Sequence, residues 1–115
     1  MGIDALETRR RFEKLAARLL TNPMVAEGTG FGASRGLRVQ GRIFAIFGLH
    51  DLTVKLPRSR VDELVATGIG QRYDPGHGRV MKEWLTVPPE HGDDWERLAE
   101  EALIFVGPLP DDHHE

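Results

Sequence analysis

The stretch GLRVQGRIFAIF, residues 36–47, decides the fold because two apolar runs flank the pair Gln40-Gly41. A two-residue hairpin turn needs backbone angles that glycine adopts without steric cost. The stretch therefore predicts two antiparallel strands joined by a tight turn. This hairpin places a β-sheet in the middle of the chain, and the other elements extend outward from it.

Further strands follow the hairpin. The segment DLTVKLP, residues 51–57, alternates apolar and polar side chains with the two-residue period of a strand. Its leucines and valine should face the core, whereas Thr53 and Lys55 should face away from it. The segment KEWLTV, residues 82–87, predicts another strand. Shorter strands are predicted at residues 25–29 and 69–73.

Three other segments have apolar residues at helical spacing, and each begins with a polar pair that favours a capped N-terminus. The pairs are Asp4 with Glu7, Ser59 with Asp62, and Asp93 with Glu96. Pro23 should stop the first helix, because proline cannot continue a helix. Gly68 suits the left-handed residue that ends many helices.

These elements predict the order helix, three or four strands, helix, two strands, helix. Short connections between strands favour antiparallel pairing. Helices that cover one face of such a sheet give a two-layer α+β domain. The chain has 115 residues, the size of one domain, so we predict a single domain over residues 1–115 with an acidic tail from about residue 108.

Charge is distributed unevenly along the chain, although the net charge is only −3. Residues 1–89 carry fourteen basic and nine acidic side chains, whereas residues 90–115 carry one basic and nine acidic side chains. The acidic segment is either a solvated helix and tail or a sign that the basic body meets an anionic partner. The sequence pI of about 5.9 argues against a strong nucleic-acid binder.

Composition also excludes several classes of protein. The chain has no cysteine, which excludes disulfides and thiolate metal sites. It has no run of about 18 apolar residues, so no transmembrane helix is predicted. The charged start MGIDALETRRRFEKL lacks the apolar core of a signal peptide. We therefore expect a soluble cytoplasmic protein without a membrane partner.

A basic stripe lies on the first predicted helix, where Arg10, Lys14 and Arg18 recur every four residues. Residues at this spacing lie on one face of a helix. The stripe is either an ordinary exposed face or a contact for phosphates or an acidic protein surface. It could also dock the acidic C-terminal segment of the same chain.

The stretch DPGHGRVMKEW, residues 74–84, is a second candidate site. Its proline and glycines are typical of a turn, which leaves His77 at a loop tip. The alternative is an anion site made by His77, Arg79 and Lys82, with glycine amides assisting. An acid–base pair of His77 with Glu83 is a weaker alternative.

Metal and nucleotide sites are not expected. The histidines lack the spacing of metal ligands. The stretch GTGFGASRG, residues 28–36, has loose dinucleotide-type glycine spacing, but a hairpin follows it instead of the helix that would bind the pyrophosphate. We therefore predict no metal and no cofactor.

The sheet also offers a candidate interface. Residues 43–47 are apolar on both faces of their predicted strand, and Trp84 points opposite to its apolar neighbour Leu85. Apolar surface around Phe44, Ile46 and Trp84 could remain on the face away from the helices. Loops or chain ends could cover this surface, or a second copy of the chain could bind there as a homodimer.

Several segments together resemble a known family. They are FG at 31–32, GLRVQGRIFA at 36–45, LTVKLP at 52–57, RVDELVATGIG at 60–70 and YDPGHGRVMKEW at 73–84. With them the chain resembles the TfoX N-terminal domain and the related MmcQ/YjbR families. The resemblance implies a two-layer helix–sheet–helix–sheet–helix fold and a link to competence regulation or DNA binding. It implies no catalytic residues.

Three functional hypotheses follow. The first is a non-enzymatic, macromolecule-binding domain of bacterial type, with DNA or protein as its partner. The second is a homodimeric protein-interaction module that uses the sheet face. The third is a binder of small anions, or an enzyme, at the loop of residues 76–83.

Overall fold

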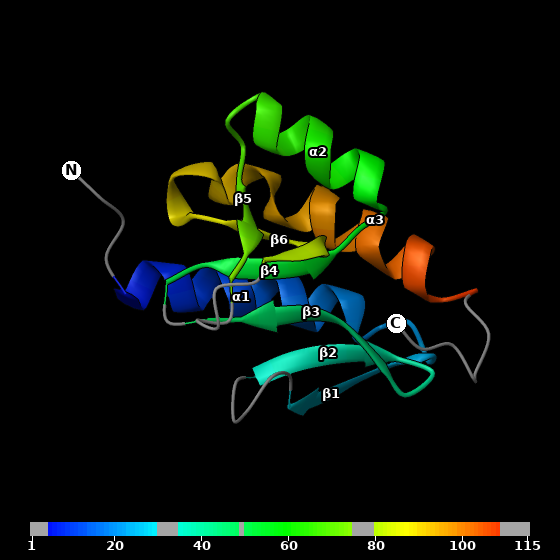
Figure 1. The fold of residues 1–115 in the computed structure, drawn as a ribbon. Coiled ribbons are helices and arrows are strands. Elements are labelled where there is room, and N and C mark those ends of the chain that lie inside the picture. The colour runs from blue at the N-terminus through cyan, green and yellow to red at the C-terminus, as the bar shows by residue number, and fades with distance from the viewer. Residues whose placement is uncertain (1–4, 30–34, 49, 75–79, 109–115) are drawn as a thin grey trace.

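The computed structural model describes residues 5–29, 35–48, 50–74 and 80–108. It confirms the predicted α+β fold and its order of elements (Figure 1). In chain order the elements are α1 (Ala5–Leu19), β1 (Val25–Thr29), β2 (Arg35–Val39), β3 (Arg42–Phe47), β4 (Leu52–Lys55), α2 (Arg58–Ala66), β5 (Gln71–Tyr73), β6 (Met81–Val87), a short 3-10 helix η1 (Pro89–Asp94) and α3 (Trp95–Val106).

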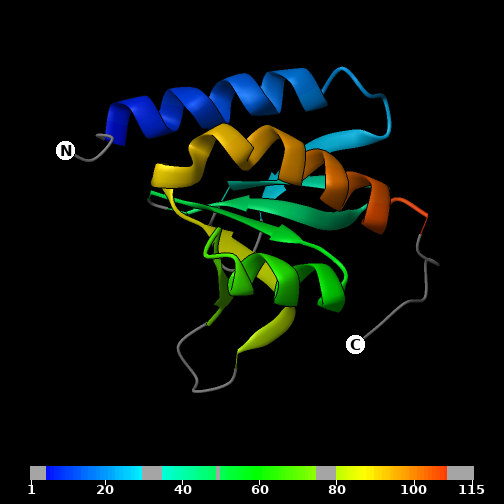
Figure 2. The same ribbon diagram turned by 90° about the horizontal axis from the view of Figure 1, so that it is seen from above.

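One antiparallel sheet forms the centre of the fold, with the strand order β1-β2-β3-β4-β6-β5. The helices pack against one face of this sheet (Figures 1 and 2). Phe12 of α1, Val61 of α2 and Leu98 of α3 all belong to a single hydrophobic core with Leu37 and Leu85 of the sheet. Burial of this continuous apolar surface is the main stabilising contribution to such a fold.

The predicted hairpin is present between β2 and β3. Gln40 and Gly41 have φ angles of 52° and 83°, and Val39 pairs with Arg42 across the turn. Positive φ at both turn residues is the geometry that matches the twist of the flanking strands. The Gln40 amide also donates a hydrogen bond of 3.2 Å to the Met24 carbonyl, which ties the turn to the start of β1.

Phe44 lies in the core, so the prediction that it forms part of an interface on the opposite face needs correction. The register shifts here, because Leu37 pairs with Ala45 whereas Arg38 pairs with Ile43. Phe44 is the extra residue of this β-bulge. The irregularity lets Phe44 and Ala45 both join the core, which explains why this run is apolar without alternation.

The sheet face away from the helices is more buried than the sequence predicts. Ile46 and Trp84 expose only 5% of their surface, and Thr53 exposes 4%. The hydroxyl groups of Thr53 and Thr86 lie 3.0 Å apart and share a hydrogen bond, and Lys55 Nζ lies 5.7 Å from the Trp84 ring centroid. This face therefore presents no open apolar patch at the predicted interface residues.

The helix starts differ from the predicted caps. α2 begins at Arg58 after Pro57, and α3 begins at Trp95 after η1; neither has a side-chain cap hydrogen bond. Proline fixes φ near the helical value, so Pro57 starts α2 earlier than a cap at Ser59 would allow. Asp93 lies inside η1, so it cannot cap α3. The predicted cap at Asp4 lies outside the described residues.

The end of α2 has the predicted glycine. Gly68 has a φ of 83°, and its amide donates to the Val65 carbonyl at 3.1 Å. The next amide, of Ile69, donates to the Leu64 carbonyl at 3.0 Å. These two bonds form a Schellman motif, which satisfies carbonyls that a helix end would otherwise leave unpaired.

Arg42 ties the end of α3 to β3. Its Nη2 donates to the carbonyls of Val106 at 3.4 Å and Gly107 at 3.2 Å. A cation at a helix C-terminus is stabilised by the helix dipole. In the described part of the chain, no helix combines the length and the apolar character needed to cross a membrane.

Candidate functional site

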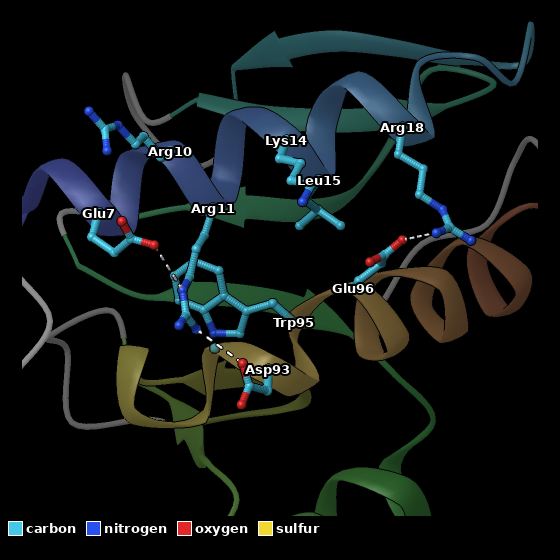
Figure 3. A pocket seen from close by; sticks show the side chains of 10 residues that line it. Glu7, Arg10, Arg11, Lys14, Leu15, Arg18, Asp93, Trp95 and Glu96 are labelled. Atoms are coloured by element: carbon cyan, nitrogen blue, oxygen red, sulfur yellow. Dashed lines mark ion pairs between the residues drawn. The ribbon is translucent and has the colours of Figure 1, made fainter.

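A cleft of about 610 Å³ lies between α1 and the segment that leads from η1 into α3 (Figure 3). We call it the α1–α3 cleft. Its lining residues are Glu7, Arg10, Arg11, Lys14, Leu15, Arg18, Gly92, Asp93, Trp95 and Glu96. One wall is therefore a basic helix, and the other is an acidic turn and helix start.

The pattern of α1 produces the basic wall. Its buried side carries Phe12, Ala16 and Leu19, which belong to the hydrophobic core. The basic residues that recur every four positions therefore remain outside the core. Trp95 lines the cleft but belongs to the hydrophobic core and exposes only 2% of its surface, and its buried indole Nε1 donates to the Val87 carbonyl at 3.2 Å.

Two arginines of the basic wall form ion pairs across the cleft. Arg18 pairs with Glu96 and, at 3.1 Å, with Glu100. Arg11 pairs more loosely, with Asp93 at 3.6 Å and with Glu7 of its own helix at 3.7 Å. Exposed pairs of this kind contribute only about 0.2–1 kcal/mol each. They hold the two walls together weakly.

Gly92 allows Arg11 to lie across the cleft. A Cβ at this position would collide with Nη1 of Arg11, and two further guanidine and side-chain atoms lie within 3.3 Å. The position of Arg11 therefore depends on the missing side chain at Gly92. This contact was not predicted, because nothing in the local sequence connects residues so far apart.

The other two cations of the basic wall differ from Arg11 and Arg18 in having no carboxylate partner among the described residues. Within the described residues, neither Arg10 nor Lys14 forms an ion pair. Figure 3 shows Lys14 between the paired Arg11 and Arg18, whereas the side chain of Arg10, which also lines the cleft, points away from Asp93. Like charges four residues apart on a helix repel each other. An anion placed between Arg10 and Lys14 would relieve that repulsion.

The structure brings together only part of the predicted site. Arg10, Lys14 and Arg18 all line the α1–α3 cleft, and Arg18 contacts acidic residues of the C-terminal segment, which was one of the predicted alternatives. Lys82 is exposed on β6, and Figure 2 shows α1 at the upper edge and the start of β6 at the lower edge. Lys82 therefore cannot share a site with the basic stripe.

The remaining predicted site residues are described only in part. His77 and Arg79 lie outside the described residues, and Glu83 is half-buried on β6. Among the residues that the structure describes, no three histidine, aspartate or glutamate side chains are grouped as metal ligands.

A separate network fixes the other side of α1 to the sheet. Arg35 of β2 donates to Glu13 of α1 at 2.5 Å and to Glu27 of β1 at 2.9 and 2.6 Å. Its guanidinium also lies 5.3 Å from the Phe12 ring centroid. The hydrogen bond from Arg35 lowers the pKa of Glu13 below its usual value. Elsewhere, burial raises the pKa of Asp51.

No protein-family model, curated protein or solved structure matches the chain. The fold is an α+β domain with three helices on a six-stranded antiparallel sheet. Among the described residues, the α1–α3 cleft, with two cations that pair with no described carboxylate, is the feature that points to a function.

Proposed function

We propose that this protein is a non-enzymatic binding domain that holds an anionic segment of another macromolecule at the α1–α3 cleft. The observation that carries the proposal is the pair Arg10 and Lys14, two cations that line a cleft of about 610 Å³ and form no ion pair within the part of the chain that the structure describes. Either phosphate groups or carboxylates would satisfy these cations.

The order of elements supports a domain of the TfoX/YjbR kind. It is the helix–sheet–helix–sheet–helix order that the sequence resemblance implies. Domains of that kind are associated with DNA binding and competence regulation. Of the predicted binding residues, those on α1 carry the proposal, and Lys82 does not.

Charge reversal on α1 tests the proposal. The double variant Arg10→Glu/Lys14→Glu is compared with Arg58→Glu/Lys82→Glu, which changes the net charge equally at exposed positions away from the cleft. The probes are a random-sequence DNA duplex and poly-glutamate, each labelled for fluorescence anisotropy at low salt. Loss of about 1.4 kcal/mol of binding free energy corresponds to a tenfold weaker affinity.

The α1 variant should weaken binding of at least one probe by about tenfold or more, whereas the control should change it by less than about threefold. Added salt should weaken wild-type binding, because the contacts are electrostatic. Equal losses in the two variants, or no wild-type binding of either probe at low salt, would contradict the proposed function.

A further inference from the structure

We infer that the partner at the α1–α3 cleft is a protein helix that carries an acidic side chain and, about two turns away, an aliphatic one. This inference rests on the proposed function and narrows it to one class of partner. It follows from three features near the cleft: the acidic wall, a neighbouring apolar hollow, and the parallel course of α1 and α3.

The acidic wall selects against a phosphate backbone. Asp93 and Glu96 of the acidic wall line the cleft together with Glu7 of α1, and the Asp93 side chain is 99% exposed. Duplex DNA carries about one negative charge per 1.7 Å of its axis, so a duplex along α1 would bring phosphates against these carboxylates. An isolated carboxylate can approach Lys14 and Arg10 without that repulsion. The charge pattern therefore favours a protein with a sparse acidic face.

An apolar hollow continues from the cleft. It has a volume of about 320 Å³ and lies at the C-terminal ends of α1 and α3. Its lining residues are Arg18, Leu19, Thr21, Asn22, Glu100, Leu103 and Ile104. Arg18 lines both the hollow and the cleft, so the two adjoin.

Ile104 is the most exposed large hydrophobic side chain of the described residues, at 73%. It stands at the rim of the apolar hollow, beside the partly exposed Leu103. Exposed apolar side chains beside a concavity, bordered by charged residues, are typical of a protein-binding surface. An aliphatic side chain from a partner would cover Ile104 and fill the hollow.

The course of the helices sets the shape of the partner. Arg11 pairs with Asp93 and Arg18 pairs with Glu100, so α1 and α3 advance side by side in the same direction. Two such helices leave a groove in which a third helix can lie. Lys14 and Leu19 are five residues apart on α1, which is about 7.5 Å along its axis, and Arg10 is about 13.5 Å from Leu19. An acidic and an aliphatic residue about seven positions apart on a partner helix, about 10.5 Å, match this spacing.

Selection of peptides tests the inference. A random peptide library is selected on the wild-type protein and, in parallel, on the double variant Lys14→Glu/Ile104→Asp. The peptides enriched only on the wild-type protein should carry an acidic and an aliphatic residue about two helical turns apart. The most enriched peptide is then synthesised and titrated by fluorescence anisotropy.

Single variants identify the part of the surface that binds. Ile104→Asp should weaken peptide binding by about tenfold or more, and Lys14→Glu should do the same. The controls are Val80→Asp, at another exposed apolar residue, and Arg58→Glu, at another exposed cation; each should change the affinity by less than about threefold. Ile104→Ser provides a milder variant, and circular dichroism verifies that every variant is folded.

Each contrary outcome has a separate meaning. If no acidic–aliphatic peptide is enriched, or if Ile104→Asp binds the selected peptide as tightly as the wild type, the inference is wrong. If duplex DNA binds through Arg10 and Lys14 and is insensitive to Ile104→Asp, the inference fails but the proposed function stands. If sedimentation shows a dimer that Ile104→Asp dissociates, the partner is a second copy of this chain, which also overturns the inference.

Discussion

The two sides of α3 make very different contacts with their neighbouring helices. On the side of α2, Arg60 donates to both carboxylate oxygens of Glu101 at 2.9 and 3.0 Å, and also to Glu63 at 2.9 Å. On the side of α1, the ion pairs enclose a cleft of about 610 Å³, and no carboxylate of residues 5–29, 35–48, 50–74 or 80–108 pairs with Arg10 or Lys14. Where two helices only stabilise the fold, ion pairs can satisfy all the charged side chains between them. A binding surface must instead keep some charged side chains available to a partner.

Trp95, which forms the floor of the cleft, should contribute to the stability of the fold. Trp95 is buried, contacts the core and donates a hydrogen bond to Val87. Trp95→Ala should lower the free energy of unfolding by about 3–5 kcal/mol, because it leaves a large cavity in the core. Urea denaturation measures this change. A loss below about 1 kcal/mol would mean that the cleft can deform without cost to the core, and the contrast between the two sides of α3 would weaken.

The ion pairs on the two sides of α3 should differ in strength. Double-mutant cycles with alanine compare Arg60–Glu101 with Arg18–Glu100. We expect a coupling of about 1 kcal/mol for the first pair, which is bidentate and only partly exposed, and about 0.3 kcal/mol for the second, whose arginine is more exposed. Thermal or urea denaturation of the seven proteins, which are the wild type, four single variants and two double variants, gives both values. Equal coupling free energies would show that the Arg18–Glu100 ion pair in the cleft stabilises the fold as much as the Arg60–Glu101 pair does.

The contact between α1 and the sheet should depend on pH in acid. Arg35 lowers the pKa of Glu13 in the folded state, so this pair stabilises the protein above the usual glutamate pKa. The contribution is lost as the pH falls through the lowered pKa. The difference in stability between wild type and Glu13→Gln should therefore be largest near neutral pH and vanish in strong acid. Denaturation curves across this range measure it, and a difference that is constant with pH would exclude the pair as its cause.

Local patterns in the sequence were sufficient to predict the order of helices and strands. The pair Gln40-Gly41 specified the hairpin because both residues adopt positive φ, and Gly68 specified the end of α2 for the same reason. The starts of α2 and α3 were predicted wrongly, because Pro57, Pro88 and Pro89 determine where the chain turns helical; Pro57 and Pro88 precede α2 and η1, and Pro89 is the first residue of η1. A competing local signal therefore outweighed the apparent capping residues.

The candidate site was only partly predictable. The spacing of Arg10, Lys14 and Arg18 correctly placed these cations on one face, but their partners on α3 depend on tertiary packing. The glutamates at positions 96 and 100 have the same four-residue spacing, and they were a usable signal for the pairing with Arg18. The bulge at Phe44 had no such signal, since it arises from the register of two paired strands.

The double role of Arg18 has a thermodynamic consequence. It lines both the cleft and the apolar hollow, and it neutralises Glu96 and Glu100. A ligand carboxylate that draws the guanidinium away leaves those two glutamates facing each other without a counter-charge. A ligand carboxylate at Arg18 therefore competes with these two ion pairs, and part of its binding free energy is lost in breaking them.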